Sequence, residues 1–284
     1  MPELPEVEVL VRHLRPLLKN KTVRAVQVRR ARVLAPTPPR QFALALRGAK
    51  FISLARRGKY LVFTLKASGR MKPLVLIGHL GMTGRMYLAR AGTPLPKHAA
   101  VVLNLGRENF VFEDTRYFGR LTLDTRAVQA LGPEPLSAEF TAKGFAQSLK
   151  HSKQPIKVKL LDQSVIAGVG NIYASEALFC ARLSPRLGAR RLKTNQVERL
   201  WRSVREVLSA AIEGGSTVPL NYAGAGATDG LFYFGRAAGS SEPYEERLQV
   251  YDRAGRPCPN CAGTIRRLVQ AARSTFYCPH CQRG

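Results

Sequence analysis

The first residues of the chain place an amine beside two carboxylates. The sequence begins MPELPEVE, and removal of the initiator Met, expected before a proline, would leave Pro2 as a terminal secondary amine. Model α-amino groups have a pKa of about 7.7–8.0, so a useful fraction is neutral at physiological pH. Attack of this amine on an aldehyde-level carbon would give an iminium ion, which is an electron sink. Pro2 is therefore a candidate nucleophile.

Glu3 and Glu6 stand where they can assist that chemistry. Glu3 could donate a proton or stabilise the developing cation. Glu6 could hold the ammonium group or complement the dipole of a helix that starts here. The same residues also make a good helix start, because prolines and acids are favoured in a first turn. Local chemistry alone leaves both interpretations open.

Four cysteines near the end of the chain have metal-ligand spacing. They form two Cys-x-x-Cys pairs, Cys258 with Cys261 and Cys278 with Cys281, and residues 262–277 lie between the pairs. Such pairs hold four thiolates around one Zn²⁺ while the intervening residues fold back as a hairpin. Two disulfides or unrelated thiols are the alternative. A four-thiolate site is closed, so this zinc would be structural.

The charge of the chain indicates a polyanionic partner. Among 284 residues, Lys and Arg number 45 and Asp and Glu 19, which gives a net charge of +26. Counterion release from phosphates would supply affinity for nucleic acid; a merely basic surface is the alternative. The length suits two or three domains. With no apolar run near ~20 residues and no signal segment, we expect a cytoplasmic, nucleoid-associated bacterial protein, by default a monomer, with no membrane partner.

Hydrophobic periodicity predicts a multi-domain α+β chain. Residues 5–18 have helical spacing, with Val7, Leu10, Val11, Leu14, Leu17 and Leu18 on one face. Seven short strands are then expected at 22–30, 49–57, 60–66, 73–80, 99–106, 109–114 and 120–124. A helix followed by short strands indicates a β-sandwich with an N-terminal helix over residues 1–130.

The remainder of the chain changes to a helical pattern. After a linker at 131–137 we expect helices at about 138–150, 153–162, 172–181 and 194–213, which form a domain over 137–216. Cys180 falls in an apolar helical run and is expected to be buried. Gly168 and Gly170 permit two tight turns that would bring Asn171 and a helix N-terminus against a phosphate. A long Gly- and Ala-rich loop, 217–247, precedes a C-terminal zinc finger at 248–284.

Five motifs in order, MPELPEVE, HLGMTG, DTRYFG, GVGNIYASE and the paired Cys-x-x-Cys, resemble the formamidopyrimidine-DNA glycosylase/endonuclease VIII family, most closely its formamidopyrimidine branch. The resemblance covers nearly the whole chain. It implies an enzyme of base excision repair that binds damaged double-stranded DNA through a β-sandwich, a helix–two-turns–helix domain and a zinc finger. It implies removal of an oxidised base and strand cleavage by β,δ-elimination, without a catalytic metal.

The resemblance also implies roles for individual residues. Pro2 would attack the sugar C1′, Glu3 would be the general acid, and Lys59 in RRGKYL would match the family's essential lysine near the lesion's phosphate. Without the resemblance, Lys59 would be an ordinary strand lysine. His79 would contact a phosphate. The matching DNA-binding residues are Met82, Arg116 and Phe118, which would fill the gap left by the extruded base, and Lys157, Asn171 and Arg273, which would grip the backbone.

Two features depart from the family pattern. Tyr117 stands where arginine is common, and the 217–247 loop is longer and reads VPLNYAG at its start. In the family this loop covers the extruded purine. Because the loop departs from the family pattern, the resemblance says least about which damaged base is preferred. The void-filling trio favours oxidised purines, 8-oxoguanine and formamidopyrimidines. The alternatives are an endonuclease VIII-like glycosylase for oxidised pyrimidines and a non-catalytic, zinc-dependent damaged-DNA-binding protein.

Overall fold

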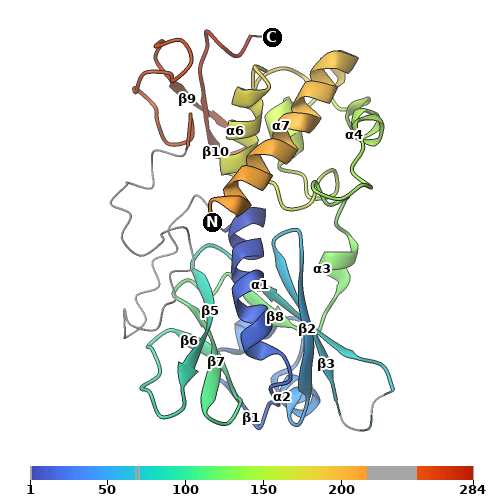
Figure 1. Ribbon diagram of the computed structural model, residues 1–284, viewed down its shortest axis with the longest axis vertical. Helices are drawn as coiled ribbons and strands as arrows, with labels where there is room; N and C mark the ends of the chain where they lie inside the picture. The colour runs from blue at the N-terminus through green and yellow to red at the C-terminus, as the bar shows by residue number, and fades with distance from the viewer. Residues whose placement is uncertain (1, 68, 70, 216–247, 284) are drawn as a thin grey trace. The chain divides into compact units, whose positions relative to one another are not determined.

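The computed structural model describes residues 2–67, 69, 71–215 and 248–283 (Figure 1), and these form two compact units. The first contains Pro2 and residues 7–130; the second contains residues 3–6, 131–215 and 248–283. Helix α1 (Leu4–Leu18) starts in the second unit and continues into the first. The predicted 217–247 loop lies outside the described residues. In the described part of the chain, no helix is long and apolar enough to span a membrane.

Helix α1 has the buried face that its periodicity predicts, with one exception. Val7, Leu10, Val11 and Leu14 are inaccessible to solvent, but Leu17 is 37% exposed. At 100° per residue, Leu17 lies off the stripe that positions 7, 11, 14 and 18 share. The placement of Leu17 in the buried face was therefore wrong.

Two antiparallel four-stranded sheets build the first unit, as the predicted β-sandwich requires. One has the order β1 (Ala25–Val28), β6 (Ala99–Asn104), β7 (Glu108–Asp114) and β5 (Gly84–Arg90). The other has the order β2 (Lys50–Arg57), β3 (Tyr60–Lys66), β4 (Leu74–His79) and β8 (Arg120–Thr122). Phe63 on β3 packs edge-on against Phe110 on β7, with ring centroids 5.7 Å apart, so the sheets share one core.

The first unit also has elements that the sequence pattern did not predict. They are η1 (Ala31–Leu34), α2 (Pro39–Leu46), α3 (Arg126–Gln129) and strand β5. The proline-rich stretch before α2 suggests only a turn, yet Pro39 suits a first helical position and Phe42, Ala45 and Leu46 are buried at helical spacing. Strand β5 follows the glycine-containing HLGMTG turn directly, which conceals its start.

Helices α4 (Ala142–Leu149), α5 (Ile156–Leu160), α6 (Asn171–Cys180) and α7 (Thr194–Glu213), with η2 (Ala189–Arg191), form the helical part of the second unit. The predicted 194–213 helix is confirmed. The first two helices are shorter than predicted, because the Thr141 hydroxyl caps α4 by accepting from Gly144 N–H (3.0 Å) and Pro155 precedes α5. Cys180 at the end of α6 is partly exposed, which corrects its expected burial.

The C-terminal residues of the second unit form the predicted hairpin. Strands β9 (Arg266–Gln270) and β10 (Arg273–Tyr277) pair antiparallel between the two cysteine pairs. Phe276 and Ile265 are buried in a small core with Phe179 of α6. The zinc-finger module therefore packs on the helix that follows the GVGN turn.

Candidate active site and DNA interface

The carboxylate of Glu3 lies at the N-terminus of helix α6. The side chain is 1% exposed. Its oxygens accept hydrogen bonds from the backbone N–H groups of Ile172 (2.9 Å) and Tyr173 (3.4 Å). The first N–H groups of a helix lack intrahelical partners and attract negative charge. Glu3 thus occupies donors that the sequence interpretation had reserved for a DNA phosphate.

Two glycines make room for this contact. A Cβ on Gly170 would lie 2.3 Å from Glu3 Cδ, and a Cβ on Gly168 would lie 2.7 Å from Leu4 Cβ. Gly168 also has a φ of +88°, a backbone conformation that residues other than glycine rarely adopt. Its carbonyl accepts a hydrogen bond from the N–H of Leu4 at 3.1 Å. The glycines of the GVG turn therefore leave the space that Glu3 and Leu4 occupy.

Glu6 fixes the same residues from the other side. It is fully buried, accepts from the Glu3 N–H at 2.7 Å, and accepts from the Tyr173 hydroxyl at 2.6 Å. The nitrogen of Glu3 and its carboxylate are thus both held. Since Pro2 is bonded to that nitrogen, the bonds that hold Glu3 also restrict the residue that carries the candidate nucleophile.

Lys157 is wholly buried between α6 and the zinc hairpin. Its Nζ donates to Asn171 Oδ1, to the Ser274 carbonyl (3.0 Å) and to the Thr275 hydroxyl (2.9 Å). The Asn171 amide also donates to the Ser274 carbonyl at 2.9 Å. Burial lowers the pKa of Lys157 to about 8; the negative charge of Glu3 opposes this shift and the positive charge of Arg273 adds to it. Arg273 itself is exposed on β10.

Lys157 and Asn171 thus join the helical part of the unit to the hairpin. With Arg273, they are the three residues expected to grip the DNA backbone, and the structure brings them together in one cluster. The structure does not place Lys157 on a solvated helix face. Its three ammonium hydrogens match three acceptors.

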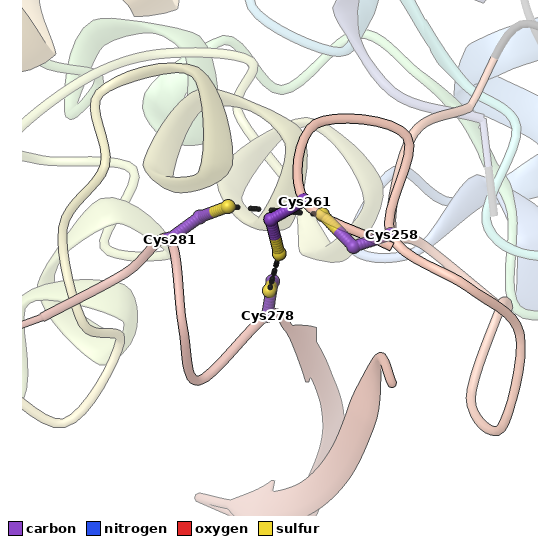
Figure 2. A group of neighbouring side chains, drawn as sticks. All are labelled: Cys258, Cys261, Cys278 and Cys281. Atoms are coloured by element: carbon purple, nitrogen blue, oxygen red, sulfur yellow. Dashed lines mark hydrogen bonds between the residues drawn. The ribbon is translucent and has the colours of Figure 1, made fainter. Parts of the chain in front are cut away.

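The four cysteines of the zinc finger converge on one centre (Figure 2). Their sulfurs all lie within 4.8 Å of one another, with 3.8 Å between Cys258 and Cys281 and 3.5 Å between Cys261 and Cys278. Tetrahedral zinc with Zn–S bonds of about 2.3 Å requires sulfurs roughly 3.8 Å apart. The residues fit a Zn(Cys)₄ site, as predicted from their spacing.

In the first unit, Lys59 lies in the turn before β3, and His79 lies on the neighbouring strand β4. Lys59 is 7% exposed in the two-residue turn between β2 and β3, and the next residue, Tyr60, pairs with His79. Burial and the charges of Lys59 and Arg120 lower the pKa of His79 to about 4. The imidazole is therefore neutral at pH 7, and because Nδ1 accepts from Gly81 N–H (3.1 Å), Nε2 carries the proton. His79 thus presents an N–H donor suited to a phosphate.

The predicted void-filling residues come from two loops and contact one another. Met82 follows β4, while Arg116 and Phe118 follow β7. The Arg116 guanidinium lies 4.7 Å from the centre of the Phe118 ring and donates to Met82 Sδ at 3.4 Å. Met82 is 44% and Phe118 45% exposed, and both contact Arg116, so two large apolar side chains are exposed at one place. Met82, Phe118 and the Arg116 guanidinium thus form one exposed group, which we call the wedge.

Sequence interpretation missed three residues that hold these parts. Asp114 accepts from both loops of the wedge, Gln163 accepts from Gly168 N–H (2.9 Å) and donates to the Val169 carbonyl (2.8 Å), and Glu176 accepts from the backbone of residues 249–251. Asp114 and Glu176 belong to quoted motifs, and an acid beside apolar residues could have indicated burial with polar partners. Gln163 lies five residues before GVGNIYASE between Asp162 and Ser164, so no comparable signal marks it.

These features define a class of protein before any comparison is made. A fixed carboxylate next to Pro2, exposed apolar side chains beside an arginine, and a four-cysteine hairpin with exposed arginines are features expected of an enzyme that extrudes and excises a DNA base. The comparisons agree. Family models for the formamidopyrimidine-DNA glycosylase N-terminal domain, the formamidopyrimidine-DNA glycosylase H2TH domain and the zinc finger found in FPG and IleRS match residues 1–121, 131–221 and 255–284.

Individual relatives match over their full length. The formamidopyrimidine-DNA glycosylase of Thermus thermophilus is 43% identical, over 99% of this chain and 98% of the relative. Two Lactococcus lactis Fpg structures, one with DNA containing Fapy-dG and one with DNA containing an oxidised pyrimidine, each have a TM-score of 0.86, 30% identity and full coverage of both chains. The chain belongs to the formamidopyrimidine-DNA glycosylase family.

Proposed function

We propose that this protein removes oxidised purines, 8-oxoguanine and formamidopyrimidines, from double-stranded DNA and cleaves the strand at the resulting abasic site. One observation carries the proposal: Glu3 is buried on the first N–H groups of α6. A carboxylate held so firmly beside the N-terminal residue suits proton transfer at a reacting sugar. Family membership supports the same activity, and one Lactococcus lactis relative was solved with DNA containing Fapy-dG.

In the proposed mechanism, the Pro2 nitrogen attacks C1′ of the damaged nucleotide, and the bond from C1′ to the base breaks as the base leaves with a proton. Glu3 supplies or relays that proton. Opening of the sugar ring gives an iminium ion, which makes the C2′ proton acidic. Its loss expels the 3′ phosphate, and a second elimination expels the 5′ phosphate. Hydrolysis of the remaining adduct returns the amine.

Extrusion of the base leaves a gap that the wedge fills. Phe118 would stack between bases, Met82 would adapt to the space, and Arg116 would hydrogen-bond to the orphaned base of the opposite strand. Lys59 and the neutral His79 would hold phosphates near the lesion. In the second unit, exposed Arg273 would contact the backbone directly. Lys157 and Asn171, which bond to the Ser274 carbonyl next to it, would join in the grip by fixing the hairpin and by adding positive charge behind it, and Zn²⁺ would hold the same hairpin.

Oxidised pyrimidines are a second candidate substrate class. A Lactococcus lactis relative was solved with DNA that contains an oxidised pyrimidine. We further propose that residues 1–130 are the catalytic domain, residues 137–216 the helical DNA-binding domain, residues 217–247 the segment that covers the extruded base, and residues 248–284 the zinc finger. We also propose that the protein acts as a monomer and is located with the bacterial nucleoid in the cytoplasm.

Borohydride trapping tests the proposal. The protein is incubated with sodium borohydride and duplexes that carry 8-oxoguanine, a formamidopyrimidine, dihydrouracil or an abasic site, and the adduct is mapped by peptide mass spectrometry. An adduct on Pro2, strongest with purine lesions, is expected. Pro2→Gly should form much less of it, because the primary amine left behind gives an imine that must be protonated before it acts as an electron sink, while Pro5→Ala, which alters an amide nitrogen, should keep it.

Three outcomes would contradict parts of the proposal. An adduct strongest with dihydrouracil would move the substrate class to oxidised pyrimidines. An adduct on another residue would remove Pro2 from its role. Tight binding of lesion DNA without any adduct, even at an abasic site, would leave a non-catalytic DNA-binding protein.

A further inference from the structure

The two loops that carry the void-filling residues are joined by one buried carboxylate. Asp114 is the last residue of β7 and pairs with Gly84, the first residue of β5. The loop with Met82 ends at β5, and the loop with Arg116 and Phe118 begins after β7. Asp114 therefore stands at the point from which both loops leave the sheet, and its side chain is fully buried.

Asp114 accepts hydrogen bonds from both loops. On the Met82 side, the Thr83 hydroxyl donates to Oδ1 at 2.5 Å. On the other side, the backbone N–H groups of Arg116 and Gly119 donate to Oδ1 (3.1 Å) and Oδ2 (2.7 Å). Hydrogen bonds to an ionised acceptor are the stronger kind.

The loops are also packed together without spare room. A Cβ on Gly81 would lie 2.6 Å from Gly119 N, and a Cβ on Gly119 would lie 3.1 Å from Asp114 Oδ2. The contact between Arg116 and Met82 Sδ exists only while the loops keep this arrangement. Asp114 is thus a buried carboxylate with hydrogen-bond partners on both of these closely packed loops.

We propose that Asp114 is a positioning residue for base extrusion: it clamps the loops of Met82 and of Arg116–Phe118 into one preformed wedge. The inference rests on the proposed function, since it concerns how that activity opens the duplex. Asp114 touches neither the sugar nor the amine in this role. Its loss should affect the extrusion of a stacked base far more than the chemistry at a site that has no base.

Asp114→Asn is the main test. The amide oxygen could still accept from Thr83 and Arg116, but without the negative charge, and the NH₂ group in place of Oδ2 would face the Gly119 N–H, so the clamp loses one charge-assisted hydrogen bond and is weakened in the other two. Excision of 8-oxoguanine from a duplex should fall about tenfold or more, the effect of losing one charge-assisted hydrogen bond. Borohydride trapping at a preformed abasic site should stay within about twofold, which is less than a single neutral hydrogen bond is worth.

A binding measurement reports the wedge without chemistry. A 2-aminopurine base next to the lesion brightens when it is unstacked, and Asp114→Asn should reduce that rise at saturating protein. Thr83→Val, which removes one hydroxyl donor at similar volume, should show a smaller loss of the same kind and decides the matter if Asp114→Asn does not fold. Asp124→Asn is the control, because Asp124 forms an exposed ion pair with Arg126.

Unchanged excision and unchanged fluorescence in both variants would overturn the proposal. So would equal losses of excision and abasic-site trapping, because Asp114 would then act on the chemistry. If the wild-type protein binds lesion DNA and excises nothing, the proposed function fails, and the fluorescence comparison between wild type and Asp114→Asn still tests the clamp by itself.

Discussion

Gly170→Ala should displace the carboxylate on which the proposed chemistry depends. The added Cβ would lie 2.3 Å from Glu3 Cδ and 2.4 Å from Glu3 Oε1, distances that real Cβ atoms essentially never show. The backbone at Gly170 is extended (φ −130°, ψ −158°), so alanine brings no strain of its own. The clash with Glu3 is the main steric consequence, and Glu3 must leave the N–H groups of α6.

The expected magnitude follows from what is lost. Overpacking of a buried position costs about 1–3 kcal/mol, which should appear as a lower free energy of unfolding. A positioned general acid contributes about 10²–10⁴ in rate, so excision of 8-oxoguanine should fall at least about 100-fold. Trapping at an abasic site should fall less, because no base has to leave.

Single-turnover excision, abasic-site trapping and thermal unfolding would be compared for wild type, Gly170→Ala and Gly188→Ala. Gly188 is the matched control: its backbone is also extended, and the nearest atom to its added Cβ lies 3.7 Å away. Gly188→Ala should excise as wild type does. If Gly170→Ala excises at the wild-type rate, or Gly188→Ala is equally impaired, the position of the Glu3 carboxylate on α6 does not control the reaction.

Three further predictions concern other parts of the molecule. Cys278→Ser should lose bound zinc, measured by plasma mass spectrometry, and weaken duplex binding about tenfold, whereas Cys180→Ser should retain one zinc; full zinc content in Cys278→Ser would refute the four-cysteine site. Because the folded-state pKa of His79 is about 4 and its ordinary value is 6.5, the unfolded protein binds more protons between these values, so stability should be full above pH 6.5 and fall as pH drops towards 4. His79→Gln should flatten this part of the unfolding profile, which His151→Gln should leave intact; equal profiles for His79→Gln and wild type would contradict the shift. Glu176→Gln should lose hydrogen-exchange protection at the amides of residues 249–251 and about 1–3 kcal/mol of stability, and unchanged protection would count against its role in holding these residues.

The sequence predicts the parts of this fold that depend on local periodicity. Helix α7 matches its prediction because Val204, Leu208 and Ile212 repeat at helical spacing over twenty residues. The zinc site is equally predictable, because two Cys-x-x-Cys pairs at this spacing are typical of tetrahedral zinc sites. Elements such as α2 and β5 were not predicted because they are short and flanked by turn-forming residues. Their hydrophobic pattern indicates an element, while the neighbouring prolines and glycines indicate a turn.

The candidate site is less readable, because its contacts join residues far apart in the chain. The GVG turn suggested a close approach of backbone to phosphate. In the structure, its glycines instead admit Glu3 and Leu4. No periodicity relates residue 3 to residue 170, and an N-terminal acid gives no local sign of which helix it will cap. The N-terminus of α6 does attract an anion, as predicted, but the anion is a side chain of the same protein.

The buried acids suggest why this arrangement suits a basic DNA-binding protein. Cations outnumber acids 45 to 19 in the sequence. Yet Glu3, Asp114 and Glu176 each accept from two or three backbone N–H groups. A backbone donor is fixed by the fold and loses no side-chain entropy when it binds, whereas a long arginine side chain does. Acids satisfied in this way stay rigid at the GVG turn, at the wedge and at the base of the zinc finger, and they leave the arginines available for the DNA phosphates.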